Sequence, residues 1–222
     1  MNTASANQNR FSSFLFIVPA LILIGALGSS LGGPVASIIG GVAGLVWGIF
    51  VGLGSTWAAR RWPNLPRRWL HIGAFIATIL FGGSLFAMLL YVASPTPENI
   101  LALMRPPFKG GFTFFVIFNS LVEWLVIPVA MFLNWQHPLR RSLLIACGVL
   151  FYLSRAWTYV YFVPQIFQFM VLKPGTSISP DLASAILKWV NLSWIRCAID
   201  GVMAVLFFRA AANPNQRVTD NG

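Results

Sequence analysis

The sequence predicts an all-α protein, a polytopic membrane helix bundle with six transmembrane helices and both termini in the cytoplasm. Three observations lead to this prediction. First, 57% of the 222 residues are hydrophobic and only 9% are charged, with a mean hydropathy of +0.75, so the chain has too little polar surface to fold as a soluble domain. Second, the apolar residues are gathered into long runs. Third, most basic residues fall between those runs, on one side of the predicted bundle.

Each apolar run is near or above the length that a spanning helix requires, which is about 20 residues. The runs cover residues 11–31, 34–58, 69–93, 112–133, 142–170 and 184–208. One side of this arrangement receives Arg10, Arg60, Arg61, Arg67, Arg68, Arg140, Arg141, Arg209 and Arg217. The other side receives only Arg105, Lys109, Lys173 and Lys188. By the positive-inside rule, the arginine-rich side is the cytoplasmic side.

The runs divide the chain into four parts. These are a cytoplasmic tail (1–10), a glycine-rich helical hairpin (11–58), a four-helix membrane bundle (69–210) and a second cytoplasmic tail (211–222). The first run also has features of a signal peptide, but the long preceding tail and the second run directly after it favour a retained helix. We expect a multi-pass protein of the plasma membrane, with a bacterial cell membrane as the simplest host.

A stripe of small residues repeats every four positions along the second run. It consists of Ala36, Gly40, Gly44, Gly48, Gly52 and Thr56. Small side chains on one helix face allow two backbones to approach closely. The stripe could pack on the first run of the same chain or on another copy. A homo-oligomer through Gly40, Gly44, Gly48 and Gly52 is therefore one expectation beside packing within the chain.

Four ionisable side chains interrupt apolar runs near their middle, namely Glu123, Arg155, Arg196 and Asp200. One charge at the centre of a spanning helix costs about 2.5–3.5 kcal/mol on insertion scales, so two acids and two bases favour pairing in one buried site. Arg196 and Asp200 share a helix face at i, i+4 spacing, whereas Glu123 and Arg155 come from neighbouring antiparallel helices. We treat all four as candidate catalytic residues. The alternative, which we call helix locking, is that these charges hold the helices together without catalysing a reaction.

Polar and aromatic residues at the same predicted depth are candidate substrate-binding residues. They are Asn119, Tyr152, Thr158, Tyr159, Asn191 and Trp194. Pro164 lies outward of Arg155 in the fifth run, where it removes a backbone donor and is expected to bend the helix. Together these residues predict a polar, aromatic-lined interior among the last three runs.

The expected partners are the lipid bilayer and a lipophilic small molecule, with no nucleic acid, metal or cofactor. The net charge of +10 resides in the loops between spans, where the positive-inside rule accounts for it. Cys147 and Cys197 lie within apolar runs without CxxC spacing, which is typical of core residues. His71 and His137 fall at the cytoplasmic ends of their runs, and a two-histidine site there stays open as an alternative. Walker, GxGxxG and Ser-His-Asp patterns are absent from the sequence.

Three stretches of the last four runs resemble a known family. They are Asn134-Trp135 followed by Arg140-Arg141, the stretch TYVYFVP from Thr158 to Pro164, and a last helix with Trp189, Asn191, Trp194 and Arg196. On these stretches, residues 69–210 resemble the anthrone-oxygenase-like family of four-helix membrane proteins, most of which have no known function. The resemblance implies an oxygenase-like fold, and characterised members oxidise polycyclic aromatic anthrones to quinones without metal or flavin.

Three functional hypotheses follow. The first is a membrane enzyme acting on a lipophilic aromatic molecule, in which Glu123 removes a proton and Arg155 or Arg196 stabilises the anion that reacts with oxygen. The second is a small-molecule or proton-coupled transporter with the four charges along its path. The third is a structural or assembly subunit that uses the glycine stripe.

Overall fold

A computed structural model describes residues 3–105, 109–173 and 177–213. Every regular element within these ranges is a helix, which confirms the all-α prediction. In chain order the elements are α1 (Thr3–Gly28), the short 3₁₀ helix η1 (Ser30–Gly32), α2 (Pro34–Arg61), α3 (Leu65–Ala93), α4 (Pro97–Met104), α5 (Lys109–Leu121), the π-helix η2 (Val122–Val126), α6 (Ile127–Asn134), α7 (Pro138–Trp157), the π-helix η3 (Thr158–Phe162), α8 (Val163–Met170) and α9 (Pro180–Ala212).

Four helical stretches of the described chain are long and apolar enough to cross a bilayer. They are Pro34–Arg61, Leu65–Ala93, Gly111–Asn134 and Pro138–Met170. These make the chain a multi-pass membrane protein. Ser12–Gly28 is apolar but shorter. α9 has 33 residues, yet its apolar sequence is broken by charges that include Arg196 and Asp200. The predicted count of six spans, and their orientation, therefore stay predictions.

The helices extend beyond most of the predicted boundaries, and three differences change the predicted tails and loops. α1 begins at Thr3, so it includes most of the stretch predicted as an N-terminal tail. α9 continues to Ala212, and residues 214–222 of the predicted second tail lie outside the described residues. The loop after α3 contains α4, which was not predicted. Pro97 begins this helix, and the Thr96 hydroxyl accepts a hydrogen bond from the Asn99 amide at 3.3 Å, as at other capped helix starts.

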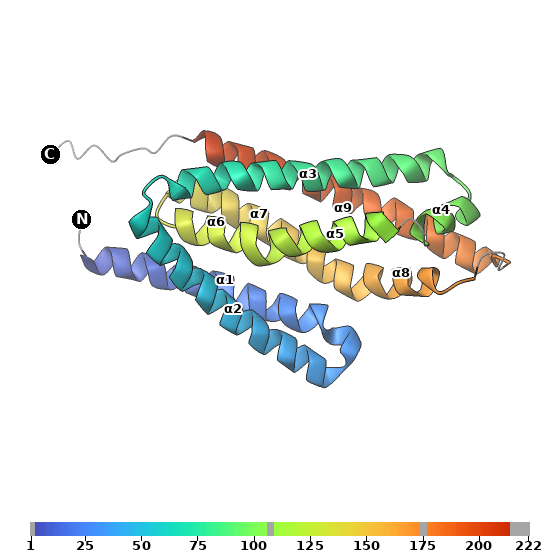
Figure 1. Cartoon of the computed structure of the whole chain (residues 1–222), viewed down its shortest axis with the longest axis horizontal. Coiled ribbons are helices and arrows are strands. Elements are labelled where there is room, and N and C mark those ends of the chain that lie inside the picture. Colours follow the sequence, from blue (N-terminus) through green and yellow to red (C-terminus); the bar gives the residue numbers. More distant parts are fainter. Residues whose placement is uncertain (1–2, 106–108, 174–176, 214–222) are drawn as a thin grey trace.

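The helices form a bundle with a hairpin at its side (Figure 1). α3, α5–α6, α7–α8 and α9 run lengthwise in the bundle, and α3 and α7 both pack extensively on α9. α1 and α2 form the hairpin, whose turn diverges from the bundle in Figure 1. Hydrogen bonds join the elements at the arginine-rich end. The side-chain amide of Asn134 donates to the Pro66 carbonyl at 3.2 Å, and the Arg140 guanidinium donates to the Asn213 carbonyl at 2.6 Å.

The glycine stripe of α2 packs against α1 of the same chain. A Cβ atom on Gly44 would overlap the backbone carbonyl of Leu21, and one on Gly40 would overlap that of Gly25. The two backbones are therefore as close as glycine permits. Packing within the chain was the first of the two predicted possibilities. A homo-oligomer through the same stripe stays a prediction that no observation tests.

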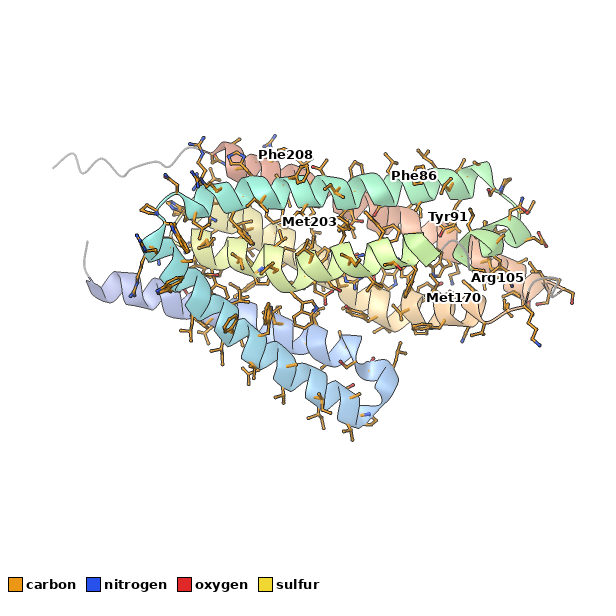
Figure 2. All side chains as sticks on the ribbon, viewed as in Figure 1. Phe86, Tyr91, Arg105, Met170, Met203 and Phe208 are labelled. Atoms are coloured by element: carbon orange, nitrogen blue, oxygen red, sulfur yellow. The ribbon has the colours of Figure 1, made fainter. Side chains whose placement is uncertain are left out.

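The half of the bundle next to the arginine-rich loops is tightly packed. Its core includes Leu70, Ala74, Val126, Met131, Leu144, Met203 and Phe207, each at most 1% exposed. Figure 2 shows Met203 inside the bundle, whereas Phe208 and Phe86 are more than half exposed on its outside. The other half of the bundle contains the candidate site.

Candidate functional site

Two helices of the bundle each contain one π-helical turn directly before a proline. η2 precedes Pro128, and η3 precedes Pro164. Proline has no backbone N–H, and its ring crowds the carbonyl four residues earlier, so the regular hydrogen-bond ladder cannot continue there. Instead, one turn of each helix contains an additional residue. The amide before each proline bonds five residues back, as Ile127 does to the Val122 carbonyl.

The carbonyls released in η2 are satisfied by side chains from other helices. The Trp124 carbonyl, four residues before Pro128, accepts a hydrogen bond from the Trp47 indole of α2 at 2.7 Å. The Glu123 carbonyl, five residues before Pro128, accepts one from the Tyr152 hydroxyl of α7 at 2.9 Å. An unpaired carbonyl in a membrane-spanning helix is costly, so these two bonds stabilise the π turn.

Glu123 and Tyr159 occupy equivalent positions, each five residues before the proline of its own π turn, and their side chains meet. The Tyr159 hydroxyl donates to the Glu123 carboxylate at 3.0 and 3.1 Å from its two oxygens. Arg155 donates from Nε to the same carboxylate at 2.6 Å and from Nη2 to the Tyr159 oxygen at 2.9 Å. We call Glu123, Arg155, Tyr159 and Tyr152 the Glu123 cluster.

The Glu123 cluster is buried and charge-balanced. Glu123 is fully buried, and Arg155 is 8% exposed. The Arg155 guanidinium also lies over the Tyr159 ring, 4.6 Å from its centroid. A buried pair of this kind is stabilised when additional donors satisfy the carboxylate, and here Tyr159 supplies one. The predicted contact between Glu123 and Arg155 is present in the structure.

Arg196 and Asp200 do not form the pair that their spacing predicts. Asp200 instead accepts a hydrogen bond from the Ser84 hydroxyl of α3, 2.6 Å from its Oδ2. The Arg196 guanidinium lies over the Phe162 ring, 4.5 Å from its centroid. Of the four predicted charges, only Glu123 and Arg155 form an ion pair, at 2.6 Å. The predicted single network is therefore two separate polar groups, with Arg196 between them.

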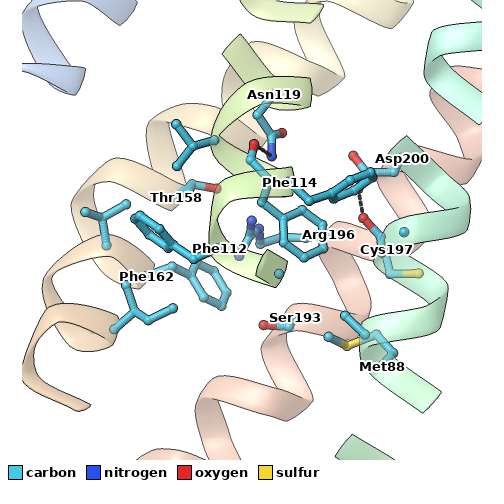
Figure 3. Close-up of a pocket in the computed structure, with 18 of the residues that line it drawn as sticks. Met88, Phe112, Phe114, Asn119, Thr158, Phe162, Ser193, Arg196, Cys197 and Asp200 are labelled. Carbon is cyan, nitrogen blue, oxygen red and sulfur yellow. Dashed lines mark hydrogen bonds between the residues drawn. The ribbon is translucent and has the colours of Figure 1, made fainter. Parts of the chain in front are cut away.

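A cavity of about 1010 Å³ lies between α3, α5, η3–α8 and α9, with α4 at its outer end. Six of the predicted site residues line it, namely Asn119, Arg155, Thr158, Tyr159, Arg196 and Asp200. Figure 3 shows Arg196 near the centre of the cavity, with Phe162 on one side and Asp200 on the other.

Four predicted site residues do not line the cavity. Glu123 and Tyr152 lie behind its wall, and both are buried within the Glu123 cluster. Asn191 and Trp194 are exposed on the outer side of α9 and take no part in the site geometry. A substrate in this cavity would therefore touch Tyr159 and Arg155 before it could reach Glu123.

Aromatic and apolar side chains make up most of the cavity wall, and sequence reasoning missed many of them. They include Tyr91, Phe112, Phe114, Phe115, Phe162, Phe167 and Trp189. Ser84, which bonds Asp200, was also missed. The sequence contains one indication of this wall, which is Gly83 beside Ser84. A Cβ atom on Gly83 would overlap the Phe114 ring. Glycine at that position makes room for the aromatic wall.

The two histidines lie apart from this site. His137 precedes α7, where burial and the charge of Arg140 lower its pKa below the ordinary value. His71 is exposed on α3. Across the described residues, no three His, Cys, Asp or Glu side chains are grouped in a way that could hold a metal ion.

The Trp47 hydrogen bond gives a first prediction about the π turn. Trp47→Phe is expected to lower the free energy of unfolding by about 1–3 kcal/mol, because it leaves the Trp124 carbonyl without its donor. Unfolding by sodium dodecyl sulfate in mixed micelles measures this change. Trp57→Phe is the control, since Trp57 lies on the same helix and is 63% exposed. Equal losses in both variants would show that the Trp47 bond does not stabilise the turn.

Comparisons of this chain with family models, curated protein sequences and solved structures give no match. The resemblance to the anthrone-oxygenase-like family therefore stays an expectation from the sequence. The site itself consists of a large aromatic cavity, a buried acid behind a tyrosine, and an arginine that lines the cavity.

Proposed function

We propose that this protein is an enzyme of the plasma membrane that oxidises a lipophilic aromatic small molecule with dioxygen. One observation carries the proposal. Tyr159 lines an aromatic cavity, and its hydroxyl is hydrogen-bonded to both Glu123 and Arg155. A hydroxyl held between a buried carboxylate and a guanidinium is prepared to pass a proton between a substrate and the carboxylate.

The proposal includes six spans with both termini in the cytoplasm. α1 and α9 would be the two additional spans, because each packs along the helices that are apolar enough to cross. The charges within α9 do not argue against counting it as a span, since Arg196 and Asp200 line the cavity and do not face outward. The arginine-rich loops would then lie on the cytoplasmic side.

The first chemical step would be proton removal from an acidic carbon of the substrate. Because Glu123 has no contact with the cavity, the proton would pass to the Tyr159 oxygen while the Tyr159 proton passes to Glu123. Protonated Glu123 no longer neutralises Arg155. The guanidinium would then stabilise the new substrate anion, so the charge balance of the site is kept throughout the step.

The second step would use dioxygen as the oxidant. The carbanion forms a bond to oxygen, and the resulting peroxide anion takes back the proton that the Glu123 cluster holds. The hydroperoxide then loses water to give a ketone. A methylene group and one dioxygen molecule thus become a carbonyl group and one water molecule, which balances atoms and electrons without a further reductant.

The packing of the bundle supports this proposal over the two alternatives. A transporter would need a path past Leu70, Met131 and Phe207, and each of these side chains is at most 1% exposed. The hypothesis of an assembly subunit depended on the glycine stripe, which is covered by α1. The cavity with its aromatic wall suits binding of one lipophilic molecule more directly.

Tyr159→Phe tests the proposed relay. With anthrone as the substrate probe, oxygen consumption by the purified protein is expected to fall by about 100-fold or more, because the relay hydroxyl is lost. Tyr161→Phe is the matched control, since Tyr161 lies in the same π turn but outside the cavity wall. Gel filtration confirms that both variants fold. An unchanged rate in Tyr159→Phe, or no oxygen consumption by the wild type, would refute the proposal.

A further inference from the structure

Arg196 is a cation in the cavity that no acid neutralises by direct contact. Within the described chain it makes no hydrogen bond and no ion pair, and its one specific contact is with the Phe162 ring. Asp200, the acid one turn away, is hydrogen-bonded to Ser84 of α3. The other cavity arginine, Arg155, is bonded to Glu123. Arg196 therefore has unused donors that face the cavity.

An arginine in this position is costly unless an anion joins it. A guanidinium inside a membrane protein loses part of its hydration, and a contact with one aromatic ring offsets only a fraction of that loss. Glu123 and Asp200, the acids of the site, already have other hydrogen-bond donors. We propose that the ligand of this cavity supplies the missing anion, as a carboxylate or phosphate group that pairs with Arg196. This inference rests on the proposed binding of a lipophilic molecule.

Tyr91 provides a second donor beside Arg196. It lies on the cavity wall, and its hydroxyl makes no hydrogen bond to any described residue. Its ring packs edge-on against Trp189, with centroids 6.1 Å apart, which holds the phenol in place. Arg155, Asp200 and Tyr91 line the same cavity as Arg196. A second cation and a neutral phenol both favour an anion, while Asp200 is held to one side by α3.

The remaining cavity wall fixes the other end of the ligand. A volume of about 1010 Å³ is at the upper end of the range for ligand pockets, which is roughly 300–1,000 Å³. Phe112, Phe114 and Phe167 cover the part of the wall formed by α5 and α8. The ligand class is therefore a lipophilic anion, with one carboxylate or phosphate group and a polycyclic or long-chain apolar body.

Equilibrium binding of a fluorescent acid and its neutral ester tests this inference. The probes are anthracene-2-carboxylate and its methyl ester, added to the full-length protein at a fixed micelle concentration. Dodecyl phosphate and inorganic phosphate serve as competitors. They show whether the site binds a phosphate on an apolar chain or the free phosphate ion. We expect the wild type to bind the acid at least tenfold more tightly than the ester. Dodecyl phosphate should displace the acid, and inorganic phosphate should not.

Variants of Arg196 show whether this side chain causes the preference. Arg196→Gln should lose at least tenfold in affinity for the acid and less than twofold for the ester, whereas Arg196→Lys should keep the preference because it keeps the charge. Arg209→Gln, an exposed arginine on the same helix, is the control and should match the wild type. Equal binding of acid and ester by the wild type would overturn the inference, as would an unchanged preference in Arg196→Gln.

The two proposals fail in different ways. If anthrone is oxidised and the ester binds, but the acid has no advantage, then the anion site is refuted and the enzyme proposal stands. If the acid preference depends on Arg196 but no oxygen is consumed, then the enzyme proposal is refuted and the anion site stands.

Discussion

Glu123→Gln is expected to lower the free energy of unfolding by about 3–5 kcal/mol, the usual cost of removing one partner from a buried ion pair. The substitution keeps the size of the side chain and removes only its charge. Arg155 then stays positively charged in the interior without its anion, because a guanidinium does not give up its proton in proteins. Unfolding of the purified protein by sodium dodecyl sulfate in mixed micelles measures the loss.

A double-mutant cycle separates the ion pair from other contacts. Arg155→Met should cost less than Glu123→Gln, because an unpaired carboxylate can neutralise itself by taking up a proton. The double variant should cost less than the sum of the two, by about 0.5–3 kcal/mol of coupling. Arg209→Met is the control for removing a charge from an exposed position. Additive costs would mean that the 2.6 Å contact contributes no coupling.

The same pair could stabilise the bundle without taking part in catalysis. Loss of stability in Glu123→Gln is expected from helix locking as well as from an active site, so stability alone does not separate them. Tyr159→Phe separates them, because it removes the hydroxyl that would pass the proton to Glu123 and keeps the Arg155–Glu123 contact. Helix locking predicts little change in oxygen consumption for this variant, whereas the proposed relay predicts a large loss.

The Glu123–Arg155 pair could be predicted from the sequence because depth in a helical span follows from residue count. A rise of about 1.5 Å per residue places both side chains at similar depths in neighbouring antiparallel helices. The partner of Asp200 could not be predicted in this way. Asp200 bonds Ser84 because of how α3 is rotated against α9. An apolar helix with few polar positions gives little information about that rotation.

The misplacement of Asn191 and Trp194 has a different cause, because the sequence did contain the relevant signal. Successive residues of a helix are rotated by about 100°. Relative to Arg196, this puts Asn191 and Trp194 about 140° and 160° away around α9, and Asp200 only about 40° away. Both residues are exposed in the structure, as this rotation requires. Depth alone had grouped them with the site.

The π turns could be predicted only in part. Pro164 indicated a disturbed helix outward of Arg155, and η3 lies directly before it. The equal spacing from Glu123 to Pro128 and from Tyr159 to Pro164 was also present in the sequence. What the spacing does not contain is the pairing of the freed carbonyls with Trp47 and Tyr152, since this depends on contacts between distant helices.

Gly44→Leu is expected to cost about 3 kcal/mol, the upper end of the usual range for overpacking. Its side chain would have to occupy the space of the Leu21 backbone carbonyl, and a helix backbone cannot move aside as a flexible side chain can. We therefore expect α1 and α2 to separate at this point. Spin labels on the two helices would report the increased distance, and unfolding in mixed micelles would report the energy.

Gly54→Leu is a matched control for this substitution. It lies on the same helix, and nothing lies within 4 Å of the position that its Cβ would take. If Gly44→Leu and Gly54→Leu have equal effects, the close approach of α1 and α2 does not stabilise the hairpin. Sedimentation of both variants tests the predicted homo-oligomer. A fall in oligomer size in Gly44→Leu, with the stability of the monomer unchanged, would favour packing between copies.

The hairpin and the site should respond together, because Trp47 lies on the same helix as Gly44 and bonds the Trp124 carbonyl of η2. A displaced α2 would withdraw the indole from this carbonyl. Gly44→Leu would then already remove the hydrogen bond that Trp47→Phe removes. The double variant is therefore expected to lose less free energy of unfolding than the sum of the two single variants. Additive losses would instead mean that the hairpin moves as a separate unit, and that the Glu123 cluster does not depend on it.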